Sequence, residues 1–249
     1  MKDTIYTQNR ELSWLRFNER VLEEAREKNV PAFEKLKFIS IFTSNLDEFF
    51  MIRVGSLYDQ TFLSKPQIDN KTGMDAAEQL SEIFRAVAPL YKKRDKIYRE
   101  VAGLLCEKGI AHPQMESLTA EERSFAEKYF IADVLPVLSP QIINAHHPFP
   151  HLVNKALYIV LQMKISDKTA YGIIPMPAMQ DRLIFLPGSG MRYVLLEELI
   201  YQYAERVFDN CEINAKSIIC VTRNADINVD DLPDEDEDFR HHMKKVLRK

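Results

Sequence analysis

The sequence predicts a multidomain protein with an N-terminal all-α antiparallel three-helix bundle, followed by an α+β domain with a mainly antiparallel sheet. Long helical periodicities fill the first part of the chain and stop at Gly109, after which short helical, proline-rich and strand-like segments alternate. The 7 glycines and the 46% apolar fraction among 249 residues are typical of a compact protein with much helix. We therefore expect two domains, residues 1–108 and residues 109–249.

Three long helices are expected in the first domain. The first follows Ser13, a residue type that caps helix N-termini, and the second follows Pro31 and runs from about Ala32 to Asp59. The third runs from about Asp75 to Cys106. Apolar residues recur at helical spacing in all three, and the connections are short, so the helices should pack antiparallel. In the second helix the predicted apolar arc contains Phe38, Ile39, Ile41, Phe42, Leu46, Phe49, Phe50, Ile52, Val54 and Leu57.

Four polar residues interrupt these apolar faces: Asn18, Asn45, Arg53 and Arg94. A polar group in a buried position destabilises the fold unless it is hydrogen-bonded. One interpretation is an interhelical hydrogen-bond network that sets the register of the helices. The other is the edge of a pocket, where an amide meets a nucleobase or ribose and an arginine faces a phosphate. The residues alone leave both interpretations open.

The second domain should contain a helix, a proline-rich segment and several strands. Thr119 and Glu122 form a capping-box pattern that begins a helix ending near Ala132. Another helix is expected from Tyr193 to about Phe208. The expected strands are Ala156–Ile165, Tyr171–Pro175, Arg182–Pro187 and Lys216–Arg223. The short break between Tyr171–Pro175 and Arg182–Pro187 predicts that these two runs pair antiparallel.

Composition indicates neither nucleic acid nor membrane as a partner. The formal net charge is −4, and no window approaches the ~18 apolar residues of a membrane-spanning helix. No signal peptide is expected at the N-terminus. Cys106, Cys211 and Cys220 follow no metal-binding spacing, and their odd number argues against a disulfide framework. We expect two of them to be core thiols, and we expect the protein to be cytoplasmic.

Other candidate sites have simpler interpretations. Gly188-Ser-Gly190 is the only glycine cluster and is expected to be a turn rather than a phosphate loop. Asp47 and Glu48 are adjacent on a helix and point ~100° apart, so they cannot share one proton or metal. His146, His147 and His151 suggest a metal hydrolase, but the nearby prolines prevent the helical spacing that zinc sites use. Structural hydrogen bonds are the favoured role of these histidines.

Several motifs resemble one enzyme family. Arg10–Asn18 (RELSWLRFN) and Leu36–Val54 (LKFISIFTSNLDEFFMIRV) resemble the opening of bacterial polyphosphate kinase, the large histidine-phosphorylated type. Val134–Pro140, the following HPFP at residues 147–150 and Val221–Asp226 resemble the same family in the same order. The resemblance covers nearly the whole chain. The residues between Pro140 and His147 depart from the family pattern.

The resemblance implies an ATP:polyphosphate phosphotransferase that uses Mg²⁺ and a phosphohistidine. It implies that the helical domain contacts the adenine side of ATP and that the second domain makes dimer contacts in a homo-oligomer, a dimer or tetramer. The phosphohistidine and metal ligands would lie beyond Lys249, so this chain should bind no metal and be inactive alone. Peripheral association with the inner face of the membrane stays open.

By motif match, Asn45 is assigned to ATP, and Arg53 is a further candidate because of its position on the helix. The chain stops on an open basic helical pattern after the acidic run Asp230–Asp238, so we expect the second domain to be truncated. The alternatives are a non-catalytic assembly module, in which Asn45 and Arg53 are purely structural, and the metal hydrolase.

Overall fold

The computed structural model describes residues 7–143, 147, 149–165, 168–208 and 211–224. It divides into two compact units. Among the described residues, the first unit contains residues 7–101 and 222–224, and the second contains residues 102–221. His146, the acidic run Asp230–Asp238 and the basic segment through Lys249 lie outside the described residues. No helix in the described part of the chain is long and apolar enough to cross a membrane.

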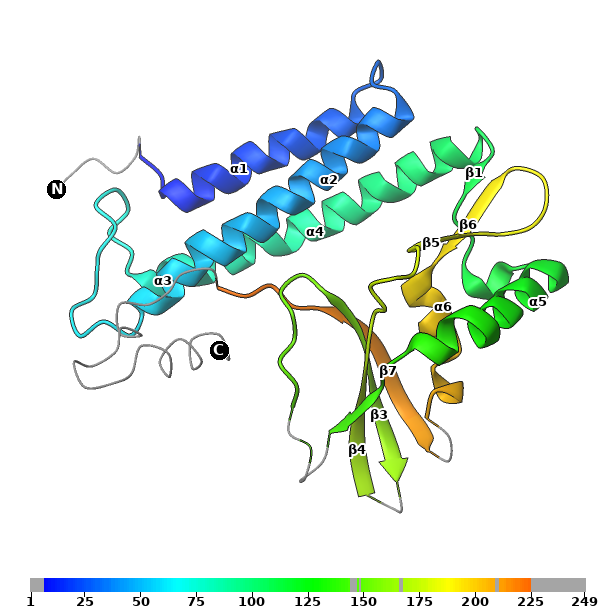
Figure 1. The fold of residues 1–249 in the computed structure, drawn as a ribbon. Helices are drawn as coiled ribbons and strands as arrows, with labels where there is room; N and C mark the ends of the chain where they lie inside the picture. Colours follow the sequence, from blue (N-terminus) through cyan, green and yellow to red (C-terminus); the bar gives the residue numbers. More distant parts are fainter. Residues whose placement is uncertain (1–6, 144–146, 148, 166–167, 209–210, 225–249) are drawn as a thin grey trace. The chain divides into compact units, whose positions relative to one another are not determined.

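The first unit is the expected antiparallel three-helix bundle (Figure 1). Its helices are α1 (Arg10–Glu23), extended by the 3₁₀ turn η2 (Glu24–Arg26), then α2 (Ala32–Phe49) and α4 (Ala76–Cys106). The π-helical segment η3 (Phe50–Val54) and α3 (Gly55–Gln60) continue α2 without a break, so the predicted helix from Ala32 to Asp59 is confirmed. The buried apolar residues of α1, α2 and α4 include Leu15, Leu22, Ile39, Phe42, Leu46, Phe49, Ile83, Val87, Ile97 and Val101.

Asn9 caps α1, so the prediction that Ser13 does so is wrong. The Asn9 carboxamide oxygen accepts hydrogen bonds from the backbone N–H groups of Glu11 and Leu12 at 2.9 and 3.1 Å. Its Nδ2 donates to Gln79 Oε1 at 2.7 Å and so links the start of α1 to α4. Ser13 lies one turn inside the helix, where its backbone N–H bonds to the carbonyl of Asn9.

The predicted apolar arc of the second helix is too wide. Ile41 and Ile52 are 45% and 40% exposed, whereas Phe42, Leu46 and Phe49 are buried. Lys35, on the same helix, is buried although lysine side chains mostly lie in solvent. Its Nζ donates to the backbone carbonyls of Ala25 and Glu27, at the end of the first helix. The lysine therefore satisfies carbonyls that have no partner within their own helix.

The second unit is an α+β fold with two small sheets. One sheet has the order β1-β6-β5 and the other has the order β2-β4-β3-β7. All pairs are antiparallel except β1 with β6. The strands are β1 (Ile110–Ala111), β2 (Gln141–Ile143), β3 (Leu157–Ile165), β4 (Lys168–Pro175), β5 (Leu183–Phe185), β6 (Met191–Leu195) and β7 (Glu212–Cys220).

Two helical segments pack with these sheets around one core. The capping box of Thr119 and Glu122 begins α5 (Ala120–Tyr129), as predicted, and η5 (Phe130–Val134) and η6 (Leu135–Val137) continue it. The other helix is α6 (Leu196–Gln202), which packs on β3 and β7 and is followed by η7 (Ala204–Arg206). A short turn, η4 (Met115–Ser117), precedes α5. The core contains Phe130, Ile159, Leu161, Met163, Ile174, Leu199 and Ile200.

Several local predictions in this unit are wrong. The expected helix from Tyr193 begins only at Leu196, because Met191–Leu195 is strand β6. The expected pairing of Tyr171–Pro175 with Arg182–Pro187 is also wrong, because β5 pairs with β6 whereas β4 pairs with β2 and β3. Gly188 and Gly190 lie at the β5–β6 turn with φ values of 120° and 95°, a conformation that favours glycine. Cys106 and Cys220 are exposed and Cys211 is half-buried, so the expectation of core thiols fails as well.

Candidate functional site

An open pocket of about 330 Å³ lies on the first unit, between α1 and the α2–η3 helix. It is lined by Trp14, Phe17, Asn45, Glu48, Phe49, Ile52 and Arg53. The two residues assigned to ATP in the sequence, Asn45 and Arg53, thus line the same pocket. Its volume falls in the range that small-molecule sites occupy, and its lining combines aromatic rings with a few polar groups.

Aromatic rings form the apolar part of the pocket. The rings of Trp14 and Phe49 are stacked, with centroids 4.5 Å apart and an interplanar angle of 8°. The ring of Phe50 lies edge-on to the ring of Phe49, with centroids 6.1 Å apart. The ring of Phe84 is tilted against that of Phe50, with centroids 6.2 Å apart. Phe17 is 47% exposed, so an aromatic surface remains open to solvent at this pocket.

Asn45 is held in place by Asn18. Asn45 Nδ2 donates to Asn18 Oδ1 at 3.1 Å, and Asn18 Nδ2 donates to the backbone carbonyl of Phe42 at 3.0 Å. Asn18 is fully buried, while Asn45 is half-buried and reaches the pocket. The predicted interhelical hydrogen-bond network therefore exists for this pair, and the same network positions a residue of the pocket.

Arg53 is exposed, so its predicted place on the buried face is wrong. The helical wheel assumes 3.6 residues per turn throughout, but Arg53 lies in the π-helical segment η3, where the turn is wider. Ile52 and Arg53 line the pocket together with Asn45 and Phe49. Among the residues that the structure describes, Arg53 forms no ion pair. π-Helical turns occur frequently at functional sites.

Arg94 does not line this pocket. Its guanidinium forms an ion pair with Asp95 at 2.7 Å and lies over the ring of Tyr91, 4.9 Å from the centroid. Both neighbours are on α4, so Arg94 has a local role on that helix. Among the described residues, the only acidic residue that lines the pocket is Glu48, and the only basic one is Arg53.

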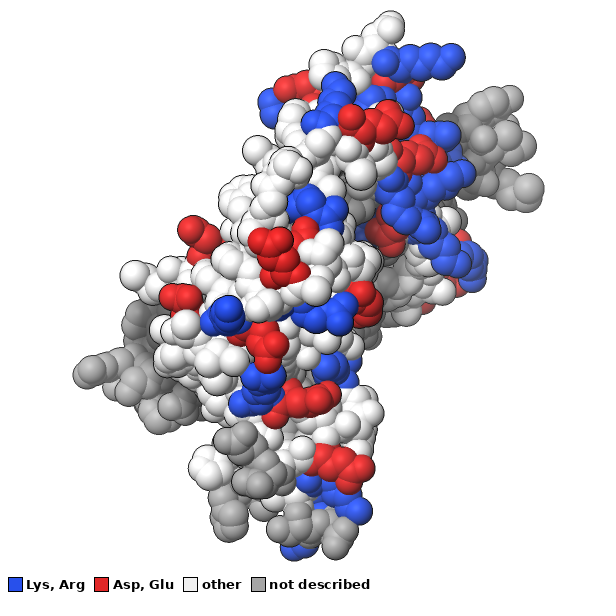
Figure 2. All heavy atoms as spheres, turned by 90° about the vertical axis from the view of Figure 1, so that its right-hand side faces the viewer, with Lys and Arg blue, Asp and Glu red and all other residues white. Residues whose placement is uncertain are grey.

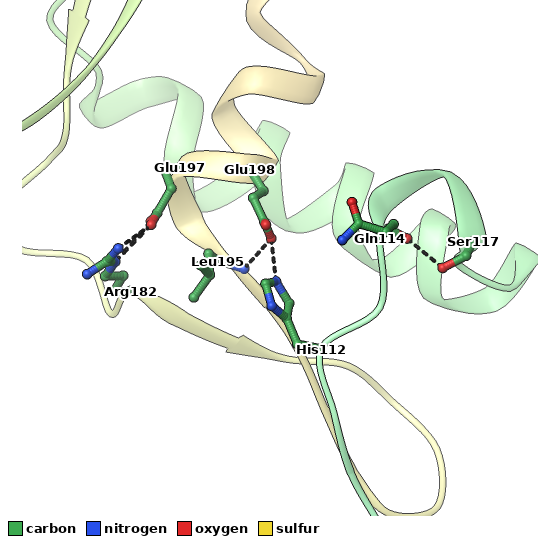
Figure 3. A network of polar contacts seen from close by, with 7 residues as sticks. All are labelled: His112, Gln114, Ser117, Arg182, Leu195, Glu197 and Glu198. Carbon is green, nitrogen blue, oxygen red and sulfur yellow. Dashed lines mark hydrogen bonds and ion pairs between the residues drawn. The ribbon is translucent and has the colours of Figure 1, made fainter. Parts of the chain in front are cut away.

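A second polar cluster lies in the other unit (Figure 3). His112 Nε2 and Glu198 Oε2 are 2.7 Å apart, and the same carboxylate oxygen accepts from the backbone N–H of Leu195. The hydrogen bond with Glu198 raises the pKa of His112, against the opposing effect of burial. Burial favours a raised pKa for Glu198, but the bonds from His112 and Leu195 lower its pKa overall. The imidazole also stacks on Tyr193, with centroids 5.1 Å apart.

Neighbouring ion pairs explain why the carboxylates of this unit are buried. Glu197 is buried and accepts two hydrogen bonds from Arg182 Nε and one from its Nη2 (Figure 3). Glu122 is buried as well, and its bond to Arg192 lowers the pKa of the carboxyl group. Arg192–Glu122 joins β6 to α5, and Arg182–Glu197 joins the residue before β5 to α6, so both pairs contribute to the fold of the unit.

The histidine cluster shows no metal-binding arrangement within the described residues. His147 and His151 are exposed, and His146 is outside the described part. No group of three or more His, Cys, Asp or Glu residues that could hold a metal ion is found among the described residues.

Sequence reasoning did not single out Trp14, Phe17, Glu48, Phe49 or Ile52 as pocket residues. A signal was present in the composition of the helix faces. The apolar arcs around Phe17 and Ile52 are wider than the surface that two neighbouring helices can cover, so part of them stays exposed.

Comparison with known families covers most of the chain. The model of the polyphosphate kinase N-terminal domain matches residues 7–112, and that of the polyphosphate kinase middle domain matches residues 121–249. This chain belongs to the polyphosphate kinase family. The first match ends at residue 112 and the second begins at residue 121. The domain boundary between residues 108 and 109 stays a prediction.

Individual members of the polyphosphate kinase family agree with this assignment. A polyphosphate kinase from Bacillus cereus is 39% identical over 258 residues, covering 100% of this chain and 36% of the relative. One from Campylobacter jejuni is 35% identical over 245 residues. The crystal structure of polyphosphate kinase from Porphyromonas gingivalis matches with a TM-score of 0.75 and 26% identity, over 90% of this chain and 34% of that chain. The chain therefore spans about a third of the length of these relatives.

Proposed function

We propose that this chain is the ATP base-binding and oligomerisation part of a polyphosphate kinase that works in the cytoplasm. The whole protein would transfer the terminal phosphate of ATP reversibly to polyphosphate through a phosphohistidine outside this chain. The observation that carries the proposal is that Asn45 and Arg53 line one pocket with an exposed aromatic surface. A nucleotide requires such a combination, because its base needs an apolar aromatic surface and its ribose and phosphate need polar side chains.

The adenine ring fits the aromatic side of the pocket. Stacking of a base on an aromatic side chain is worth about 1–3 kcal/mol in nucleic-acid complexes and does not depend on the identity of the base. Identity requires hydrogen bonds, and a carboxamide offers both a donor and an acceptor to the edge of a purine. Asn45 is the carboxamide that lines the pocket.

The phosphate side of ATP is assigned to Arg53. A guanidinium that forms no ion pair among the described residues is available for a phosphate, and arginine binds phosphate oxygens through two parallel N–H groups. Mg²⁺ prefers carboxylate oxygens, and Glu48 is the one acidic residue that lines the pocket. These residues do not make a Mg²⁺ site, so we assign the ion no role in this chain.

The sole tryptophan of the sequence, Trp14, lines the pocket, so intrinsic fluorescence reports on its occupancy. We expect adenosine and ATP each to change this fluorescence in a saturable way. Asn45→Ala should weaken both ligands by similar factors, on the order of tenfold, because base recognition is common to them. Arg53→Ala should weaken ATP by a similar factor and leave adenosine unchanged.

Arg99→Ala is the matched control, because Arg99 is exposed on α4 and lies outside the pocket. It should bind both ligands as the unaltered chain does. If Asn45→Ala and Arg53→Ala are folded and bind ATP with unchanged affinity, the pocket is not the nucleotide site. Both residues would then have the purely structural role of an assembly module.

A further inference from the structure

The hydrogen bonds behind Asn45 have a fixed direction. The backbone carbonyl of Phe42 can only accept, so the group of Asn18 that lies 3.0 Å from it must be the Nδ2 amide. The Asn18 oxygen then faces Asn45 and accepts from Asn45 Nδ2 at 3.1 Å. Because Asn18 is fully buried, water does not compete for either bond.

This chain of bonds fixes which atom Asn45 presents to a ligand. If the Asn45 carboxamide turned over, its oxygen would face the oxygen of Asn18 without a hydrogen between them. Asn45 Oδ1 is therefore an oriented acceptor, and it accepts no hydrogen bond from any described residue. The second N–H of its Nδ2 remains as a donor beside that acceptor.

We propose that Asn18 is a positioning residue that makes this pocket select 6-aminopurine nucleotides over 6-oxopurine nucleotides. The inference rests on the proposed function and adds its base specificity. The amino group of adenine is a donor, and the neighbouring ring nitrogen is an acceptor, which matches the oxygen and the amide of Asn45. A 6-oxopurine in the same orientation places its own oxygen against Asn45 Oδ1.

The magnitude of the selectivity follows from the cost of an unmatched polar pair. Sites that hydrogen-bond a substrate group discriminate strongly against analogues that leave the partner unpaired. The pocket is open and water can enter it, so we expect a ratio on the order of tenfold between ATP and inosine triphosphate. The purine nucleoside triphosphate without a 6-substituent should fall between them, because it loses a bond without creating a repulsion.

The test is a set of Trp14 fluorescence titrations of the 249-residue chain with these three triphosphates. The unaltered chain should bind in the order ATP, the unsubstituted analogue, inosine triphosphate. In Asn18→Leu, which has a similar volume and no hydrogen-bonding group, the Asn45 carboxamide can turn over. The ratio of the ATP and inosine triphosphate affinities should then fall toward one, while binding of ATP persists.

The outcomes separate this inference from the proposed function. Equal affinities for ATP and inosine triphosphate in the unaltered chain overturn the selectivity, whereas loss of ATP binding in Asn45→Ala still supports the pocket as the ATP site. An unchanged ratio in folded Asn18→Leu overturns the role of Asn18. If Asn18→Leu does not fold, the order of the three ligands on the unaltered chain tests the selectivity, and Asn18→Asp, whose carboxylate cannot donate to the Phe42 carbonyl, takes the place of Asn18→Leu in testing the role of Asn18. Unaltered ATP binding by Asn45→Ala would refute the proposed function itself.

Discussion

Asn18 lies on α1 with none of its surface exposed, and both ends of its carboxamide are hydrogen-bonded to residues of α2. Asn45, its partner, is half-buried beside an open pocket. Asn18→Ala should destabilise the first unit by about 1–3 kcal/mol, because it removes both bonds and leaves a cavity. Asn45→Ala should cost less than about 1 kcal/mol, because water from the pocket can reach the oxygen that it leaves unpaired. Urea denaturation of both variants measures the difference.

A reversed order of these two values would contradict the assignment of Asn18 to structure and Asn45 to the ligand. A substitution at Asn29, an exposed residue in the turn before α2, serves as the control. Asn29→Ala should leave the denaturation midpoint nearly unchanged, since surface changes away from special features usually have small effects.

His112 should make the stability of the second unit depend on pH. The bond with Glu198 raises the pKa of His112 above its ordinary value of 6.5, so the folded state binds the proton more tightly than the unfolded state does. This contribution is fully present below pH 6.5 and is lost as the pH rises through the folded pKa. For Glu198 the pKa is lowered, so its contribution is present above its ordinary 4.5 and is lost as the pH falls through the folded pKa.

Comparison of the unaltered chain with His112→Gln, by denaturation at several pH values, measures this effect. The difference in the free energy of unfolding should be largest between about pH 5 and 6.5 and should shrink toward pH 9. His151→Gln is the matched control, because His151 is exposed on a loop. A difference that grows with rising pH would show that the charged form of His112 does not contribute.

At the scale of elements, the long helices were predictable and the local winding was not. Apolar spacing predicted α4 and the continuous helix from α2 to α3 within one or two residues. The π-helical turn at η3 has no distinct signal in the residues Phe50–Val54, and it displaced Arg53 from the face that uniform winding assigns to it. Asn45 precedes that turn and lines the pocket, while its assignment to ATP stays a prediction.

Short strands were the other failure of sequence reasoning. β1 and β2 have two and three residues, too few for an alternating pattern to be recognised. β6 runs directly into α6 at Leu195, so apolar residues of both elements merged into one predicted helix. Both errors concern elements that long-range pairing defines, because β6 joins β5 to β1 across the sheet.

Two glycines of the second unit should respond oppositely to substitution by alanine. Gly172 lies in β4, where an added Cβ would contact the end of Met163 and come 2.8 Å from Phe208 Cζ. Gly172→Ala should therefore destabilise the unit by about 1–3 kcal/mol through overpacking. Gly103 lies in α4 with nothing within 4 Å of an added Cβ, so Gly103→Ala should stabilise by about 0.5–1 kcal/mol.

Thermal unfolding of both variants tests this pair, since each substitution adds the same methyl group. The midpoint should fall for Gly172→Ala and rise for Gly103→Ala. Equal shifts of the same sign would show that packing around Gly172 does not limit the unit.

At the scale of the whole molecule, the formal net charge does not attract a polyanion. Basic and acidic side chains lie close to one another over most of the face drawn in Figure 2, and the formal net charge is −4. Phosphoryl transfer requires positioned cations and a nucleophile around the reacting phosphate. The pocket offers one guanidinium, from Arg53, so we assign it to binding and not to transfer.

The chain incubated with ATP labelled at the γ-phosphate and with Mg²⁺ should therefore acquire no acid-labile label. A longer form of the protein, of the length of its polyphosphate kinase relatives, should become labelled under the same conditions. Acid-labile label on the 249-residue chain, mapped to His147 or His151, would place the chemistry in the histidine loop instead.

A crystal structure of the chain with ATP tests the central claim most directly. We predict that the base lies against the aromatic side of the pocket, with its 6-amino group in hydrogen-bonding distance of Asn45 Oδ1 and a phosphate facing Arg53. A nucleotide bound elsewhere on the chain, or a base whose amino group is directed away from Asn45, would contradict the account.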